Sequence, residues 1–283
     1  MPKEFLVCID SDGCAFDTME IKHKECFCPA YIRYFGLQPV SKYARDAWDF
    51  ANLYSAFRGV NRFPVLLKAL DVLRDRKEVL QRGFQTPELP SLRAYIAAGL
   101  PLNNAGLEAY LADHPEDEEL KNVLAWSYDV NKRVGELVFG VPPFPHVREN
   151  LQKLAEVADI VIVSATQTLA LEREWGENGL LPLITAVKGQ EAGSKKEVIG
   201  SLKDQYAPGH VLMIGDAPGD RDAAKANDAL FYPICPDREA ESWADFPRCM
   251  EAFLSGTYAG AAEAANIAHF ETLLPQEPTW EKG

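Results

Sequence analysis

Short apolar segments alternate with helical patterns through the C-terminal half of this chain, and this alternation constrains the fold more than any other feature. The apolar segments span residues 159–165, 183–189, 210–216 and 229–234, and FLVCI at residues 5–9 is of the same kind. Between them, VRENLQKLAEVA, TLALEREWGENG and SKKEVIGSLKDQYA carry apolar residues three and four positions apart, which is the helical spacing. Strands that alternate with helices form a parallel sheet covered on both faces. The sequence therefore predicts an α/β fold with a doubly wound parallel sheet.

The stretch between the first strand and the second contains no comparable apolar segment. Residues 18–144 carry helical patterns instead, such as KECFCPAYIRYFG and DEELKNVLAWSYDVNKRVGELVFG. A chain of 283 residues is long enough for two domains, each with its own core. We therefore expect residues 1–17 and 145–283 to form the α/β core and residues 18–144 to form an inserted all-α domain. The Pro-rich segment VPPFPH, residues 141–146, is the expected return linker.

Two pairs of aspartates follow strands of the predicted sheet. Asp10 and Asp12 come directly after the first strand, and Asp216 and Asp220 lie in the segment GDAPGD after a later one. Ligands of open parallel sheets bind at the carboxyl edge, where these residues would meet. Two carboxylates about 4 Å apart repel by roughly 4 kcal/mol at an effective dielectric of about 20. Either some of them are protonated or a hard cation such as Mg²⁺ binds there. The alternative for each segment alone is an ordinary turn.

Further polar groups stand at other strand ends. Ser164 ends DIVIVS, residues 159–164, within the apolar segment at 159–165, and Lys195 and Lys196 open the helix that follows residues 183–189. Alone, the serine would be a helix N-cap and each lysine a surface charge. Together with the aspartates, they predict an anion-binding site near a helix N-terminus.

These motifs, taken in order, resemble those of the haloacid dehalogenase superfamily. DSDGCAFD resembles the family's D-x-D-G loop, and GDAPGD resembles its G-D-x-x-x-D loop. Ser164 and Lys195 stand where the family has a hydroxyl and an anchoring lysine. Where that lysine is often followed by proline, this chain has Lys196, so Ser194 as the N-cap is what favours Lys195. The match covers residues 5–17 and 144–235, and residues 18–144 match only as a helical cap at the type-1 insertion point.

The resemblance implies a role for each of these residues. Asp10 would be the nucleophile that forms an aspartyl-phosphate, and Asp12 the general acid and base. Mg²⁺ would be held by Asp10, the backbone carbonyl of Asp12 and Asp216. Ser164 and Lys195 would bind the phosphoryl group, and Asp220 would support them.

The presence of Asp12 favours one of the family's reactions. Dehalogenases of this fold lack an acid at that position because halide leaves without a proton, and phosphonatases recruit a cap lysine. The leading interpretation is therefore a phosphatase that hydrolyses a small phosphate monoester. A phosphomutase with the same residues is the first alternative. A catalytically silent binding protein on the same scaffold is the second.

Composition indicates which partners and which cellular compartment to expect for this protein. The formal charge of −13 argues against a surface that binds nucleic acid or anionic lipid. No segment approaches the roughly 20 apolar residues of a membrane span, and no secretion signal precedes the first strand. Six scattered cysteines, without zinc-site spacing, predict reduced thiols in a cytoplasmic protein. The C-x-C pair Cys26 and Cys28 could be a redox or metal pair, but ordinary helix residues are the simpler interpretation, as loop packing is for Cys14.

A basic loop in the predicted cap is the one candidate for substrate specificity. FRGVNRF, residues 57–63, interrupts two helical patterns and brings Arg58, Asn61 and Arg62 together. The arginines could grip a carboxylate or second phosphate of a small soluble substrate when the cap closes. The alternative is that they are solvated or pair with nearby acids. Oligomeric state cannot be inferred from the sequence.

Overall fold

The computed structural model describes residues 2–283, and in them one five-stranded, fully parallel sheet. Its strands are β1 (Phe5–Ile9), β2 (Ala158–Val163), β3 (Ala186–Lys188), β4 (Val211–Gly215) and β5 (Leu230–Pro233). Across the sheet they follow the order β3-β2-β1-β4-β5. Each strand coincides with one of the predicted apolar segments, and only β2 extends beyond its segment, by one residue at Ala158. The predicted fold class, α/β with a doubly wound parallel sheet, is confirmed.

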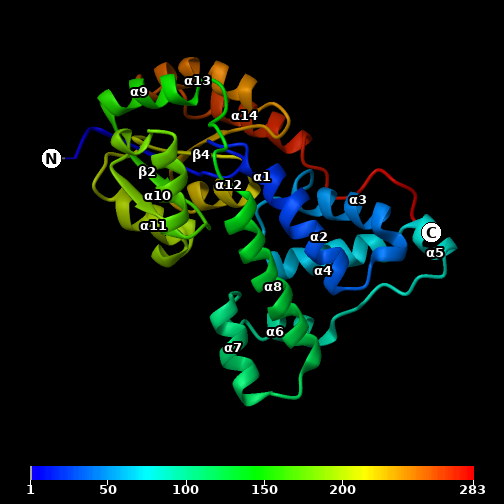
Figure 1. The fold of residues 1–283 in the computed structure, drawn as a ribbon. Helices are drawn as coiled ribbons and strands as arrows, with labels where there is room; N and C mark the ends of the chain where they lie inside the picture. Colours follow the sequence, from blue (N-terminus) through cyan, green and yellow to red (C-terminus); the bar gives the residue numbers. More distant parts are fainter. Residues whose placement is uncertain (1) are drawn as a thin grey trace. The chain divides into compact units, whose positions relative to one another are not determined.

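Helices cover both faces of this sheet (Figure 1). One face packs against α9 (Val147–Val157), α10 (Thr168–Glu177) and α13 (Glu239–Leu254), and the other against α11 (Lys195–Lys203), α12 (Pro218–Lys225) and α14 (Ala261–Thr272). Successive strand residues point to opposite faces, so β1 sends Phe5, Val7 and Ile9 into one core and Leu6 and Cys8 into the other. Because both faces are covered, the strand must be apolar throughout, as its sequence is.

The chain divides into two compact units, which we describe separately. Of the described residues, the α/β unit comprises 2–19 and 140–274, and the helical unit comprises 20–139 and 275–283. The predicted boundaries at residues 17 and 144 fall within a few residues of these. The last nine residues differ from the expectation, because they pack with the helical unit rather than with the α/β core.

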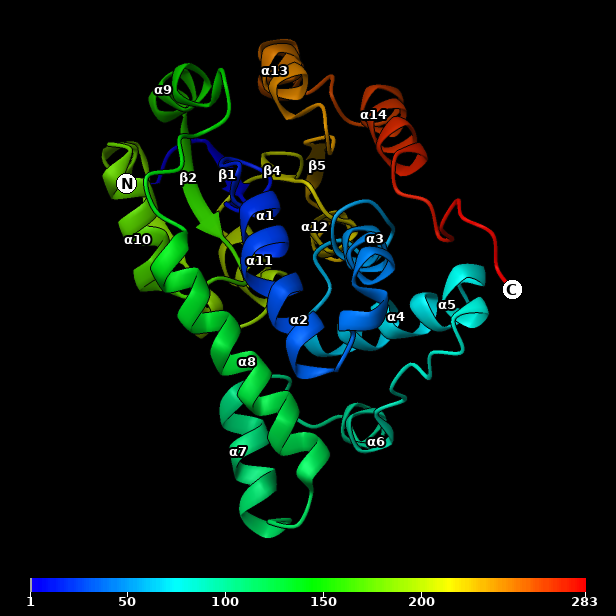
Figure 2. The same ribbon diagram turned by 45° about the vertical axis from the view of Figure 1, so that its right-hand side comes forward.

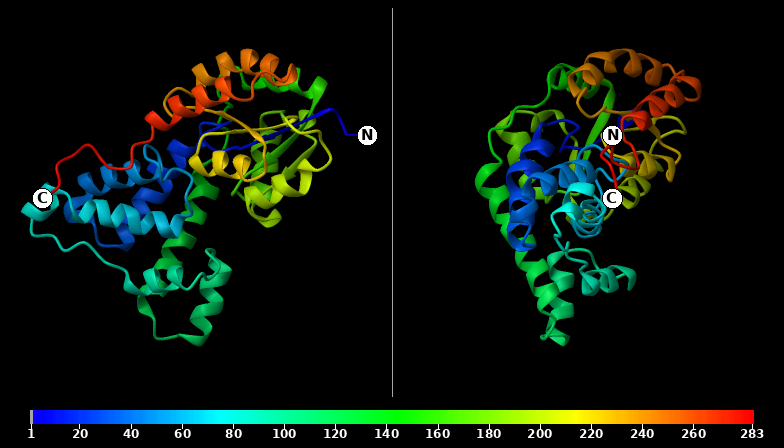
Figure 3. Two further views of the ribbon diagram at one scale, coloured as in Figure 1. Left: turned by 180° about the vertical axis from the view of Figure 1, so that it is seen from behind. Right: turned by 90° about the vertical axis from the view of Figure 1, so that its right-hand side faces the viewer.

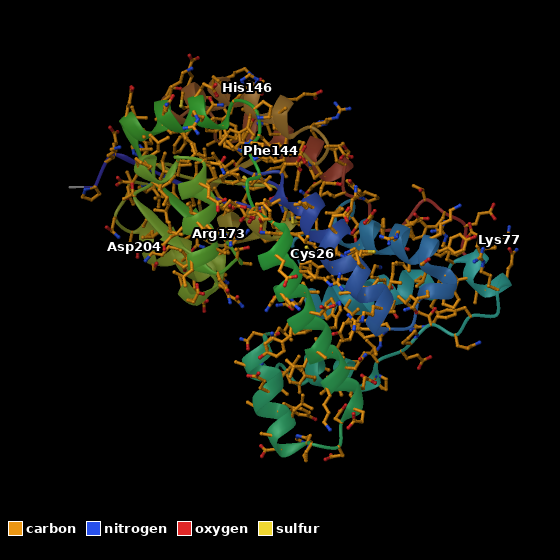
Figure 4. The ribbon with its side chains drawn as sticks, in the orientation of Figure 1. Cys26, Lys77, Phe144, His146, Arg173 and Asp204 are labelled. Carbon is orange, nitrogen blue, oxygen red and sulfur yellow. The ribbon has the colours of Figure 1, made fainter. Side chains whose placement is uncertain are left out.

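The contacts of the C-terminal segment explain this difference. The Arg76 guanidinium lies 4.7 Å from the centre of the Trp280 ring, and the amide of Gly283 donates to the carbonyl of Asp75 at 2.9 Å. Lys77, labelled in Figure 4, forms an ion pair with Glu281. The sequence pattern of PQEPTWEKG holds no periodicity from which such partners could be predicted.

The helical unit has its own aromatic core. Tyr31, Trp48, Phe63 and Trp126 are fully buried in it. Helices α3 and α4 pack side by side, as Figure 3 shows. From residue 18 to residue 137 the helices are α1 (Thr18–Ile21), a π-helix (Lys22–Phe27), α2 (Cys28–Tyr34), α3 (Ser41–Asn52), α4 (Arg62–Arg74), α5 (Lys77–Gln81), α6 (Pro90–Ala97), α7 (Asn104–Asp113) and α8 (Glu118–Leu137), with a short 3₁₀ turn at Gln38–Val40. Two further 3₁₀ turns, Leu181–Leu183 and Gln190–Ala192, belong to the α/β unit.

The cysteines are buried, and each carries a free thiol. Burial raises the pKa of the Cys8 thiol to about 12 and of the Cys26 thiol to about 11. Burial, reinforced by neighbouring aspartates, also raises the pKa of the Cys14 thiol. A thiol that resists ionisation is a poor nucleophile and metal ligand, which favours packing roles. In the described part of the chain, no helix combines the length and apolarity that a membrane span requires.

Candidate active site

The strand order places a topological switch point between β1 and β4. From β1 the chain proceeds to β2 and β3 on one side, and then crosses to β4 and β5 on the other. Figure 2 shows β1 between β2 and β4. Ligands of open parallel sheets bind at such a switch point, beyond the carboxyl ends of the strands. Asp10 follows β1 there, and Asp216 follows β4.

The loop after β1 is held rigidly by its own backbone and by two buried tryptophans. The carbonyl of Ser11 accepts hydrogen bonds from the amides of residues 14–16, at 2.9–3.3 Å. Gly13 supplies the positive φ, 72°, that this tight turn requires. The indole of Trp175 donates to the Ser11 hydroxyl at 2.9 Å, and that of Trp243 donates to the carbonyl of Cys14 at 2.8 Å. The backbone that carries Asp10 and Asp12 is therefore fixed from α10 and from α13.

Lys195 joins two buried carboxylates at this edge. Its ammonium lies 2.5 Å from Asp10 Oδ2 and also bonds Asp220 Oδ1. Ser194 caps α11 through a capping box with Glu197, which makes Lys195 the first residue of the helix. Lys196 is exposed, and its carbonyl accepts from the side chain of Asn227. Of the two lysines, the structure brings Lys195 to the aspartates.

The pKa values of these groups reflect their burial. Burial raises the pKa of the Asp10 carboxyl to about 6, Lys195 opposes this rise, and Asp220 adds to it. Burial likewise raises the pKa of Asp220, again against the effect of Lys195. Burial works against the charge on Lys195, but Asp10 and Asp220 outweigh it and raise the pKa of the ammonium. The lysine therefore stays charged and favours ionised carboxylates.

Three of the aspartates form a compact acidic cluster. Carboxylate oxygens of Asp10, Asp216 and Asp220 lie within 4.8 Å of one another, and all three residues are buried. Asp220 packs so closely that a Cβ at Gly215 would lie 2.4 Å from its side chain, so only glycine fits at the end of β4. Oxygen donors of this kind suit Mg²⁺, which prefers a few carboxylates together with water and phosphate oxygens. The donor set fits the predicted cation.

Asp12 is oriented by two hydroxyl groups that sequence reasoning missed. Its Oδ1 accepts from the hydroxyl of Thr18, the first residue of α1, and its Oδ2 accepts from the hydroxyl of Thr166 at 2.8 Å. Thr166 stands two residues after Ser164, a spacing that could have drawn attention to it. Ser164 itself is buried at the end of β2, and its hydroxyl accepts from the amide of Thr166 at 3.3 Å.

The three candidate specificity residues lie in the helical unit, where each has a partner. Asn61 caps α4 by accepting from the amide of Phe63, and its own amide group donates to the carbonyl of Leu102. Arg58 is buried and donates to the carbonyl of Leu53 at 2.9 Å.

Arg62 is held by neutral groups of the same unit. Its guanidinium donates to the hydroxyl of Ser127 at 3.0 Å and to Asn131 Oδ1 at 2.7 Å. It also lies 5.1 Å from the centre of the Phe27 ring. Burial lowers the pKa of Arg62 to about 10. These contacts give all three residues a part in the helical unit's own structure, and their role in specificity stays a prediction.

Comparison with known proteins identifies the fold. No protein-family model matches the sequence, and no curated protein matches it at a significant level. A structure from Bacteroides fragilis, assigned as a haloacid dehalogenase-like hydrolase, is 12% identical with a TM-score of 0.51, and the match covers 85% of this chain and 93% of that one.

Two further structures align less closely. A predicted phosphoglycolate phosphatase from Haemophilus somnus is 15% identical, with a TM-score of 0.47 and coverage of 88% of this chain and 99% of that one. A Bacteroides vulgatus protein assigned as a β-phosphoglucomutase is 16% identical, with a TM-score of 0.47 and coverage of 90% and 91%. From the Bacteroides fragilis match, the chain has the fold of the haloacid dehalogenase-like hydrolases, as its motifs predict.

Proposed function

We propose that this protein, with its haloacid dehalogenase-like fold, is a Mg²⁺-dependent phosphatase that hydrolyses a small phosphate monoester through an aspartyl-phosphate. The observation that carries this proposal is the ion pair of Lys195 with Asp10 and Asp220 at the switch point between β1 and β4. A buried carboxylate kept ionised by a lysine is a suitable nucleophile. A structural ion pair alone would not require Asp12 to lie beside it with its carboxylate fixed by hydroxyl groups.

The reaction would proceed in two steps. The Asp10 carboxylate attacks phosphorus, the P–O ester bond breaks, and Asp12 donates a proton to the departing alkoxide. Water then attacks the phosphorus of the aspartyl-phosphate and gives a proton to Asp12. This step breaks the bond between phosphorus and Asp10, releases inorganic phosphate and restores the Asp10 carboxylate. Lys195 and the Ser164 hydroxyl would bind the oxygens of the phosphoryl group throughout.

Asp10, Asp216 and the backbone carbonyl of Asp12 would hold the cation. When bound, Mg²⁺ would neutralise charge on the phosphoryl oxygens and on the carboxylates around them. The donor chemistry of the buried cluster supports this assignment.

The substrate class is inferred from the chemistry of the site. Asp12 can protonate a leaving group, which an ester oxygen needs and a halide does not. Arg58, Asn61 and Arg62 remain the predicted specificity residues.

Hydrolysis of p-nitrophenyl phosphate with Mg²⁺ and with EDTA tests the proposal. We expect the wild type to turn over only with Mg²⁺, and Asp10→Asn and Asp12→Asn to lose nearly all turnover with their circular dichroism unchanged. Asp12→Asn loses turnover even on this ester because water must give its proton to Asp12 in the second step. Asp222→Asn, an exposed acid on α12, is the matched control and should behave like the wild type.

Activity of Asp10→Asn within about tenfold of the wild type, with deamidation excluded by mass spectrometry, would contradict the proposal. A mutase would use the same residues. It differs in needing a bisphosphate activator and in returning the phosphoryl group to its substrate, so release of inorganic phosphate without an activator identifies the phosphatase.

A further inference from the structure

Thr166 links two groups of the proposed active site that lie far apart in the sequence. Its hydroxyl donates to Asp12 Oδ2 at 2.8 Å, and its backbone amide donates to the Ser164 hydroxyl at 3.3 Å. Asp12 would exchange protons with the leaving group and with water, and Ser164 would bind the phosphoryl group. A single residue in the loop after β2, Thr166, therefore contacts both Asp12 and Ser164.

The position of Thr166 is set by the backbone around it. Its carbonyl accepts from the amide of Gln190 at 2.9 Å, just beyond β3, and the amide of Ser164 donates to the carbonyl of Lys188 at 3.1 Å. The two loops approach so closely that a Cβ at Gly189 would lie 2.6 Å from the Thr166 carbonyl oxygen. Thr166 is thus held by the end of β3, independently of Asp12.

Thr18 contacts only one of the two oxygens of the Asp12 carboxylate, Oδ1. A hydroxyl bound to one carboxylate oxygen defines a distance, but the carboxylate can still rotate about that contact. With Thr166 on the second oxygen, the plane of the carboxylate is defined by donors from α1 and from the loop after β2. Efficient proton transfer requires such a fixed geometry relative to the ester oxygen.

We propose that Thr166 is a positioning residue that aligns Asp12 for proton transfer to the leaving group. This inference rests on the proposed phosphatase function and adds a residue to it. The expected effect of losing the Thr166 hydroxyl depends on the leaving group of the ester. An ester whose leaving group is a weak acid needs the proton from Asp12, whereas p-nitrophenolate departs with little assistance. Loss of the Thr166 hydroxyl should therefore slow the first kind of ester more than the second.

The test compares kcat/KM for phenyl phosphate and p-nitrophenyl phosphate, because this parameter covers the steps up to departure of the leaving group. We expect Thr166→Val to lose at least about tenfold more activity on phenyl phosphate than on p-nitrophenyl phosphate. Thr166→Ser keeps the hydroxyl and should retain the wild-type ratio between the two esters.

Thr168→Val is the matched control. The Thr168 hydroxyl also donates to a carboxylate, Glu191 Oε2, at 2.7 Å, and Thr168 stands two residues after Thr166, at the start of α10, but its partner is on the surface. The same chemical change there should leave the ratio between the two esters unaltered. Thermal unfolding of each variant is measured first, and Thr166→Ala replaces Thr166→Val if the valine variant does not fold.

The experiment distinguishes failure of the proposed function from failure of the inference about Thr166. If the wild type hydrolyses neither ester with Mg²⁺, the proposed function is wrong and the inference falls with it. If the wild type is active but Thr166→Val slows both esters equally, or no more than Thr168→Val does, the phosphatase stands and Thr166 does not position Asp12.

Discussion

At the scale of single residues, Lys195 is a basic side chain that pairs with two carboxylates of the site. It is the cation that contacts the nucleophile candidate Asp10, and it also contacts Asp220, which is fully buried. Lys196 differs from it by one position but points to solvent, because consecutive helix residues are about 100° apart around the axis. The sequence left these two lysines open, and the capping box at Ser194 favours the first.

Replacing each lysine by methionine tests this difference. Lys195→Met removes the charge that favours ionised Asp10, and we expect a loss of about 100-fold or more in kcat/KM for p-nitrophenyl phosphate. Lys196→Met should stay within about twofold of the wild type. Equal losses in the two variants would mean that the helix presents its lysines differently from the structure described above.

At the scale of secondary-structure elements, the edge strand β5 is protected by side chains from α14 and the segment before it. The amide of Phe231 donates to Glu263 Oε1 at 2.8 Å, and the carbonyl of Phe231 accepts from the Tyr258 hydroxyl at 2.9 Å. Glu263 also pairs with Lys225. These contacts satisfy backbone groups that an edge strand otherwise leaves open to pairing with another chain.

Substitution of Glu263 should therefore lower stability without affecting the site. Glu263→Ala leaves the buried amide of Phe231 unsatisfied, and we expect the free energy of unfolding in urea to fall by about 1–3 kcal/mol. Glu271→Ala, on the same helix, breaks an exposed ion pair with Arg221 and should cost about 0–1 kcal/mol. Glu263→Gln keeps an acceptor oxygen and should recover part of the loss. Indistinguishable values for the two alanine variants would refute the protective role of Glu263.

At the scale of the whole molecule, the stability of the metal-free protein should depend on pH through its buried acids. Burial raises the pKa of Asp10 in the α/β unit and of Asp49 in the helical unit, each to about 6. For both groups the folded state binds the proton more tightly than the unfolded chain does. Their stabilising contribution is present at low pH and is lost as the pH rises through about 6.

Thermal unfolding in EDTA measures this dependence. We expect Tm to fall between about pH 5 and about pH 7, on either side of the pKa of Asp10, and we expect the fall to be smaller in Asp10→Asn because one of the titrating groups is gone. The difference between the two proteins isolates Asp10 from Asp49. Identical pH profiles would show that Asp10 titrates in the folded protein as it does in the unfolded chain.

Sequence reasoning succeeded where structure depends on short-range patterns. The strands and the flanking helices follow from runs and periodicities within about a dozen residues, because burial on both faces of a sheet demands continuous apolar strands. The motifs around Asp10 and Asp216 were recognisable for the same reason, since each occupies a few consecutive residues after a strand.

Tertiary structure decided which distant residues meet. Thr166 reaches Asp12 across 154 positions, and Trp243 reaches Cys14 across 229, so no local pattern could reveal either contact. Both depend on the order of the strands, which places β2 beside β1, and on which helix covers which face. The packing of Trp280 against Arg76 likewise needed the folded helical unit. The sequence by itself determined the elements and the chemical groups at their ends. The close packing of those elements determined which groups orient one another, because hydrogen bonds form only over a few ångströms and parallel strands bring together segments that are far apart along the chain.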